Sequence, residues 1–283
     1  MPLKTISLAL IANSDPDPAT AVRYSLDLAG RTGAHLLARI GVPPLVMPTL
    51  GYSTYVSASQ MRTMVEQEDA ERREQAEQMA RMIQTEAERL GAIASVEVLS
   101  AAYDPVAPHL MRMARVSDVC ITLAPPATEP QQRDVLIDML FGAGVPLLLV
   151  PANWNQPGPI RKAIVAWDGG ACAARAVRDA LTLLADAESV EVVSVLGEKD
   201  IGTEASGSDI ARHLARHCRE VSVNVLPVGE HGVAATLFAH GILTRTDLMV
   251  MGGYGHSRLR EFVLGGVTRD TLARTDIPTL LSH

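Results

Sequence analysis

The stretch DLMVMGGYGHSRLREFVLGGVT, residues 247–268, joins a short apolar run to two groups of glycines. The run over 247–251 has the composition of a buried strand. A glycine after a strand permits positive φ and lets a ligand approach the backbone closely. Glycines at the start of a helix leave its N–H groups uncovered, and these groups attract anions. The stretch therefore predicts two backbone cradles for an anion at the carboxyl end of a strand.

Apolar runs and helical patterns alternate on both sides of this stretch. In residues 160–283 the pattern predicts strands over 160–167, 190–196, 221–226, 247–251 and 277–281. Helices are predicted between them over 171–187, 208–220, 232–245 and 267–275. Strands that alternate with helices favour right-handed crossovers and a parallel sheet.

The first 150 residues repeat the same order. Strands are predicted over 3–11, 35–41, 93–100, 118–123 and 145–150, and helices over 18–33, 61–91, 105–116 and 131–142. The segment PANWNQPGP, residues 151–159, has the Pro-rich composition of a linker. We therefore expect a domain over 1–150, a linker over 151–159 and a second domain over 160–283, each Rossmann-like with a five-stranded parallel sheet and helices on both faces.

Three anchors align the two halves. The apolar runs that match between the halves align Lys4 with Lys162, Asp118 with Asp247 and Val145 with Ile277. The first half has extra residues between the first two anchors, within 42–91, where a Pro- and Met-rich loop precedes a charged helix. The helix is interpreted as a surface helix with one stripe packed on the sheet, or as a partner-binding helix. The loop is interpreted as a lid or contact surface.

Composition limits the class of protein. Hydrophobic residues make up 47% and aromatic residues 4%, so small and aliphatic side chains must build the core. A net charge of −7 makes a general nucleic-acid binder a poor hypothesis. The chain has only three cysteines, which suggests a reducing compartment, and its first residues lack the pattern of a signal peptide or membrane span. We expect a cytoplasmic protein with no membrane partner.

Asp168 follows the first strand of the second half. Ligands of open parallel sheets bind outside the carboxyl ends of strands where the strand order reverses, which would place Asp168 across a crevice from Gly252 and Gly255. There the carboxylate could accept a hydrogen bond from a base amino group or a ribose hydroxyl. Alternatively, Asp168 caps the helix that begins near Ala171.

Taken together, these residues make the second half resemble the nucleotide-binding branch of the universal stress protein family. That branch carries Gly-x-x-Gly, nine residues, then Gly-Ser or Gly-Thr. The positions of this motif are Gly252, Gly255, Gly265 and Gly266, and the family's Asp falls on Asp168. The resemblance further assigns adenine contacts to Ala166, Val195 and Met251, and a backbone contact with the phosphates to Val267.

The resemblance implies a tandem stress-response protein that binds an adenine nucleotide, ATP with Mg²⁺ brought by its phosphates, in the second half. It implies the strand order 3-2-1-4-5 and a pseudo-dimer of the two halves joined through their last strands, with a homodimer as a further option. Gly266 replaces the family's Ser or Thr, so one phosphate hydrogen bond is missing. Such a bond contributes about 0.5–1.5 kcal/mol, roughly tenfold in affinity.

The first half lacks these features. The position aligned with Asp168 is Leu10, and prolines stand where the glycines would be: Pro125, Pro126 and Pro130. We therefore expect no nucleotide site there. Since Gly266 also departs from the motif, a nucleotide-free module that acts through protein partners is the alternative function.

Enzymatic motifs are missing from the sequence. It has no GxSxG elbow, no GxxxxGKS or GxxxxGKT loop and no HExxH. We expect at most slow ATP hydrolysis, while an enzyme of the wider nucleotide-binding α/β group would require a substrate that no residue indicates. His213 and His217 share one helix face, but no third ligand with suitable spacing accompanies them, so we expect no metal site.

Overall fold

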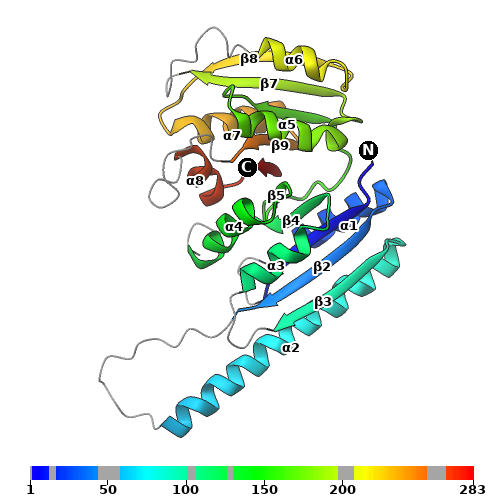
Figure 1. The fold of residues 1–283 in the computed structure, drawn as a ribbon, viewed down its shortest axis with the longest axis vertical. Helices are drawn as coiled ribbons and strands as arrows, with labels where there is room; N and C mark the ends of the chain where they lie inside the picture. Colours follow the sequence, from blue (N-terminus) through cyan, green and yellow to red (C-terminus); the bar gives the residue numbers. More distant parts are fainter. Residues whose placement is uncertain are drawn as a thin grey trace.

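The computed structural model describes residues 2–12, 17–43, 58–100, 106–125, 130–196, 207–253 and 266–283 (Figure 1). In the first half the elements are β1 (Thr5–Ile11), α1 (Ala19–Thr32), β2 (His35–Val42), α2 (Ala58–Leu90), β3 (Ala94–Ser100), α3 (Val106–Ala114), β4 (Val119–Leu123), α4 (Pro130–Gly142) and β5 (Leu147–Val150). In the second half they are β6 (Lys162–Ala166), α5 (Ala171–Leu184), β7 (Ser189–Leu196), α6 (Ser208–Leu214), β8 (Val221–Pro227), α7 (Gly232–Thr244), β9 (Leu248–Gly252), α8 (Gly266–Ala273) and β10 (Thr279–Ser282).

All ten of these strands form one sheet in the order β3-β2-β1-β4-β5-β10-β9-β6-β7-β8. Within each half the paired strands are parallel, and each half shows the predicted order 3-2-1-4-5. The halves meet where β5 and β10 pair antiparallel, with Leu148 opposite Leu280. The predicted fold class, an α/β protein built on parallel five-stranded units, is confirmed.

Helices cover both faces of the sheet. One hydrophobic cluster combines alternate strand residues, such as Leu8 and Val165, with residues of α1, α2, α5 and α6. The second cluster combines the opposite strand residues, such as Ala9 and Ile164, with residues of α3, α4, α7 and α8. Because parallel strands are covered on both sides, their sequences are almost continuously apolar.

Two aspartates occupy the same position in the two halves. The Oδ2 atom of Asp118 accepts the N–H groups of Lys4 and Thr5, at 2.7 and 2.9 Å. The Oδ2 atom of Asp247 likewise accepts two N–H groups at 2.9 Å, from Arg161 and Lys162. The carboxylates thus tie the starts of β4 and β9 to the starts of β1 and β6.

These contacts correct the predicted alignment by one residue. Thr5, and not Lys4, corresponds to Lys162, so the residue that corresponds to Asp168 is Ile11 and not Leu10. Both first strands are apolar at nearly every position, so the sequence matches almost equally well in either register. The difference matters because successive strand residues point to opposite faces.

One predicted helix is shorter in the structure, and another is packed on the sheet over only part of its length. The helix expected over 208–220 ends at Leu214, since the chain must turn to pair Glu220 with Val190 at the start of β8. The long helix α2 has its fully buried positions at Ala76, Ile83 and Ala87. Its earlier part extends beyond the sheet (Figure 1). The predicted packed stripe is therefore confined to the second part of the helix, and the loop over 44–57 lies outside the described residues.

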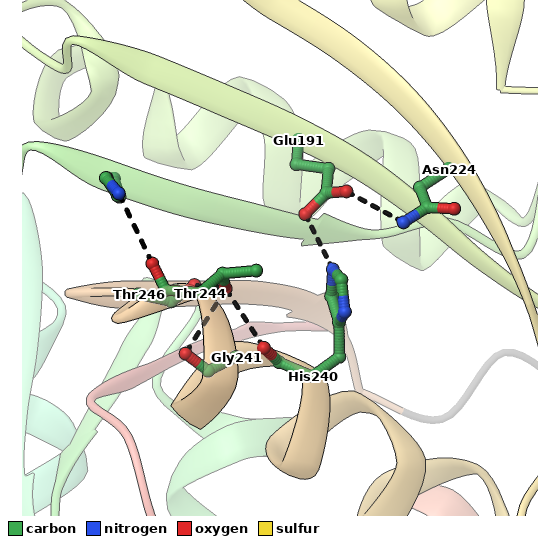
Figure 2. A network of polar contacts seen from close by, with 7 residues as sticks. Glu191, Asn224, His240, Gly241, Thr244 and Thr246 are labelled. Carbon is green, nitrogen blue, oxygen red and sulfur yellow. Dashed lines mark hydrogen bonds and ion pairs between the residues drawn. The ribbon is translucent and has the colours of Figure 1, made fainter.

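A polar network fixes α7 to the sheet at the end opposite the carboxyl ends of the strands (Figure 2). Glu191 of β7 lies 2.7 Å from Nε2 of His240 and accepts a hydrogen bond of 2.9 Å from Asn224 of β8. The hydroxyl of Thr244 donates to the carbonyl of His240. The network satisfies partly buried polar groups, which explains it as a structural feature.

We predict that Asp247→Ala destabilises the protein by about 1–3 kcal/mol, because two N–H groups lose a charged acceptor. Urea unfolding followed by circular dichroism measures the change. Asp186→Ala, at an exposed position after α5, is the control and should shift the free energy of unfolding by less than about 0.5 kcal/mol. Equal stabilities of the two variants would contradict the prediction.

Candidate functional site

The predicted apolar site residues lie on one face of the second-half sheet. Ala166 is in register with Met251 of β9 on one side and with Val193 of β7 on the other. Met251 belongs to the cluster under α7 and α8, and Ala166, Val195 and Val267 pack against that cluster. The strand order reverses between β6 and β9, which is where open parallel sheets bind ligands.

Helix α8 contacts β9 through Thr271. The hydroxyl of Thr271 donates to the carbonyl of Val267 at 2.8 Å and lies 3.6 Å from Sδ of Met251. Gly266 is exposed and Val267 is partly buried, and together they form the first turn of α8. The N–H groups of a first helical turn have no intrahelical acceptor, so they are available to a ligand.

Asp168 lies exposed in the short turn between β6 and α5. Its Oδ1 atom accepts the N–H group of Gly170 at 2.8 Å, and Gly169 has a φ of 75°. Gly170 is the N-cap residue of α5, and no side-chain cap hydrogen bond is formed there. Asp168 therefore closes the turn that precedes α5, and its hydrogen bond reaches the N-cap residue of that helix.

Gly252 is required by packing. A Cβ atom at this position would lie 2.5 Å from the backbone nitrogen of Ala173 and 2.7 Å from the carbonyl carbon of Cys172. The end of β9 thus passes directly under the first turn of α5. At Gly266, in contrast, a Cβ atom would meet nothing within 4 Å. The missing side chain of Gly252 has a structural cause, whereas packing gives no cause for the one missing at Gly266.

The middle of the motif cannot be placed. Gly255 and Gly265 lie outside the described residues, as does the segment of 254–265 that contains Arg258 and Arg260. The structure therefore brings together Ala166, Val195, Met251, Gly252, Gly266 and Val267 at one edge of the sheet, with Asp168 in the adjoining turn.

The corresponding part of the first half is filled. A hollow of about 20 Å³, roughly the space of one water, is lined by Leu10, Ile11, Thr122, Leu123, Pro125, Gln132 and Leu136. Leu123 stands where the second half has Gly252. Gly41 corresponds to Val195, and a Cβ atom there would lie 2.1 Å from Cγ1 of Val106. A nucleotide needs a cavity of several hundred Å³, so the hollow of about 20 Å³ is too small to hold one.

The three thiols, of which only Cys172 is next to Asp168, are poorly suited to nucleophilic chemistry. Partial burial raises the pKa of the Cys172 thiol, Asp168 raises it further and Arg175 opposes the shift. Burial also raises the pKa of Cys120 to about 12, and it raises the pKa of Cys218. A thiol with a raised pKa is protonated near neutral pH, and only the thiolate is a strong nucleophile.

The described residues form no metal site and no membrane span. Among them, no three His, Cys, Asp or Glu side chains gather as a metal site, although the rings of His213 and His217 lie 5.0 Å apart. No helix in the described part of the chain has the length and apolar character that crossing a membrane requires.

Sequence reasoning missed two residues that contact Gly253, Leu140 and His283, and a third, Phe141, that packs on His283. Leu140 and Phe141 come from α4 of the first half, and His283 directly follows β10. The ring of His283 meets that of Phe141 edge-on, with 4.5 Å between centroids. No local sequence signal connects these positions, because they meet only through the pairing of β5 with β10.

The sequence matches no protein-family model and no curated protein. Solved structures share its fold over nearly the full length. A universal stress protein from Archaeoglobus fulgidus aligns with a TM-score of 0.71 and 14% identity, over 98% of this chain and 95% of that one. A functionally unknown protein from Pseudomonas aeruginosa aligns with a TM-score of 0.57 and 13% identity, over 98% and 92%. The chain thus has the fold found in a tandem-length universal stress protein.

We predict that Gly252→Ala lowers the midpoint of thermal unfolding by several degrees, because backbone atoms of α5 occupy the space of the new methyl group. Gly266→Ala is the matched control and should leave the midpoint unchanged or slightly raised. Differential scanning calorimetry of both variants tests this. A Gly252→Ala midpoint equal to that of the wild type would refute the packing explanation.

Proposed function

We propose that the protein is a tandem universal stress protein whose second half binds ATP and whose first half does not. The observation that carries the proposal is the convergence of Ala166, Val195, Met251 and Val267 on one face at the switch point, beside Asp168. The tandem-length fold likeness and the glycine spacing support the same function. The proposal includes the domains 1–150 and 160–283, a cytoplasmic location and a role in the stress response.

In this proposal the adenine lies against Ala166, Val195 and Met251, and Asp168 accepts a hydrogen bond from the base or the ribose. The phosphates lie on the N–H groups of Gly255, Gly265, Gly266 and Val267. The first turn of α8 supplies the last two of these donors and the positive end of its dipole. Mg²⁺ enters with the phosphates, which suits an ion that keeps most of its waters.

The first half serves as a partner for the second. Its last strand β5 pairs with β10, and the two halves form an intramolecular pseudo-dimer in this proposal. In the corresponding part of the first half, Leu10, Ile11 and Leu123 line a hollow of about 20 Å³, which is too small for a base or phosphates. ATP hydrolysis is slow, because the described site presents no base placed to activate water.

One observation favours the nucleotide-free alternative. The part of α2 that extends beyond the sheet exposes 65% of Met64 and has no fully buried described residue before Ala76. A projecting helix of this kind suits contact with a protein partner. The alternative function is an interaction module that acts through this helix, and a binding measurement with ATP separates the two.

We expect Asp168→Ala to weaken ATP binding at least tenfold, because a charged acceptor of one or two ligand hydrogen bonds is lost. Isothermal titration calorimetry with ATP and Mg²⁺ measures the dissociation constants. Asp186→Ala carries the same charge change away from the site and should bind as the wild type does. Absence of ATP binding to the wild-type protein would overturn the proposed function.

Restoring the hydroxyl at position 266 tests the phosphate end of the site. Gly266→Ser should tighten ATP binding about tenfold, which corresponds to one added hydrogen bond to a phosphate oxygen. Gly266→Ala provides the same backbone change without the hydroxyl and serves as the control in the same titrations. If serine and alanine at this position give the same affinity, the phosphates do not lie at the start of α8.

A further inference from the structure

The residue at which the glycine stretch leaves the sheet is held from three directions. The N–H group of Gly253 donates to the carbonyl of Ser282 at 2.8 Å. Its own carbonyl lies 3.1 Å from Nδ1 of His283. On its α-carbon side, a Cβ atom at Gly253 would lie 2.8 Å from Cδ2 of Leu140. Both backbone polar groups of Gly253 and the space beside its α-carbon are thus occupied.

His283 is itself fixed by both halves of the chain. A carbonyl oxygen only accepts, so Nδ1 of His283 must carry the proton that it donates to Gly253. Phe141 of α4 packs edge-on against the imidazole, and Sγ of Cys172 in α5 lies 3.9 Å from the same Nδ1 atom. Figure 1 shows α4 beside the end of the chain that carries His283. The ring orientation therefore depends on a helix of the first half.

We infer that His283 is a positioning residue for the glycine loop, and that α4 of the first half sets its orientation. The claim that His283 affects ATP binding rests on the proposed function. The claim that His283 holds the backbone at Gly253 does not. Gly253 is the last described residue before the loop that carries Gly255 and Gly265. Fixing the first peptide of a loop reduces the conformational freedom that binding would otherwise have to remove. The first half thereby contributes to ATP binding in the second half without touching ATP.

Two measurements test this on the full chain. Hydrogen exchange of the peptide that spans Gly253, read by mass spectrometry without nucleotide, reports how firmly the loop start is held. Calorimetry with ATP and Mg²⁺ reports the effect on affinity. His283→Ala should raise the exchange rate about threefold or more and weaken ATP binding about fivefold, a loss of one hydrogen bond. His283→Asn retains an amide donor and should recover most of both effects.

Phe141→Ala is the second variant, since it removes the packing on the imidazole and keeps the donor. It should shift exchange and affinity in the same direction as His283→Ala. Leu243→Ala, at an exposed position of α7 remote from the loop, is the control and should change neither. Thermal unfolding of each variant shows that the fold is retained.

The outcomes separate the two ideas. Exchange that rises in His283→Ala and Phe141→Ala, with weaker ATP binding, supports the inference. Exchange equal to that of Leu243→Ala overturns it, whatever the affinity for ATP. Raised exchange with unchanged affinity overturns the claim that the loop start matters for the ligand. Wild-type protein that does not bind ATP refutes the proposed function, and with it the ligand part of the inference, while exchange still decides whether His283 holds the loop.

Discussion

The pairing of β5 with β10 is the contact on which the arrangement of the molecule depends. Every residue of both strands is buried, and Leu147, Leu148, Leu280 and Leu281 lie at the junction. Without its partner, each strand would present an apolar edge with unpaired N–H and C=O groups, which is a template for aggregation. The chain avoids this by supplying both strands itself. The junction also places α4 next to the end of β9. The contacts of Leu140 with Gly253 and of Phe141 with His283 therefore follow from the strand pairing.

The two halves carry different side chains at the switch point, although they share one fold. The second half has Asp168, Val195 and Gly252 where the first has Ile11, Gly41 and Leu123. In the first half α3 packs on the sheet, and Val106 occupies the space over Gly41. In the second half the turn from β6 to α5 is short, and α5 begins directly over Gly252. The same strand order therefore supports Ile11 and Leu123 at the switch point of one half, and Asp168 and Gly252 at that of the other.

The apolar runs were sufficient to predict the succession of strands and helices along the chain, and two of three anchors were aligned correctly. The order of the strands within the sheet was predicted from the family resemblance and not from the runs. The first anchor failed by one residue because β1 and β6 are apolar in both registers, and only the N–H groups accepted by Asp118 and Asp247 reveal the correct one. Gly252 was interpreted through its ligand, although its contact with Ala173 alone requires glycine. His283 and Phe141 could not be found from sequence, since their contact joins distant elements through the sheet.

A glycine stretch that binds polyanions must combine bare N–H groups with a defined backbone path, and these needs oppose each other. Glycines supply the bare N–H groups but have the greatest conformational freedom to lose. Here the first residues of the stretch are constrained from outside it, by Ala173 over Gly252 and by Leu140 and His283 at Gly253. The restraint at Gly253 comes partly from the first half. Under the proposed function, this gives a physical reason for the chain to retain its first half: α4 limits the freedom of the backbone to which the ligand of the second half is assigned.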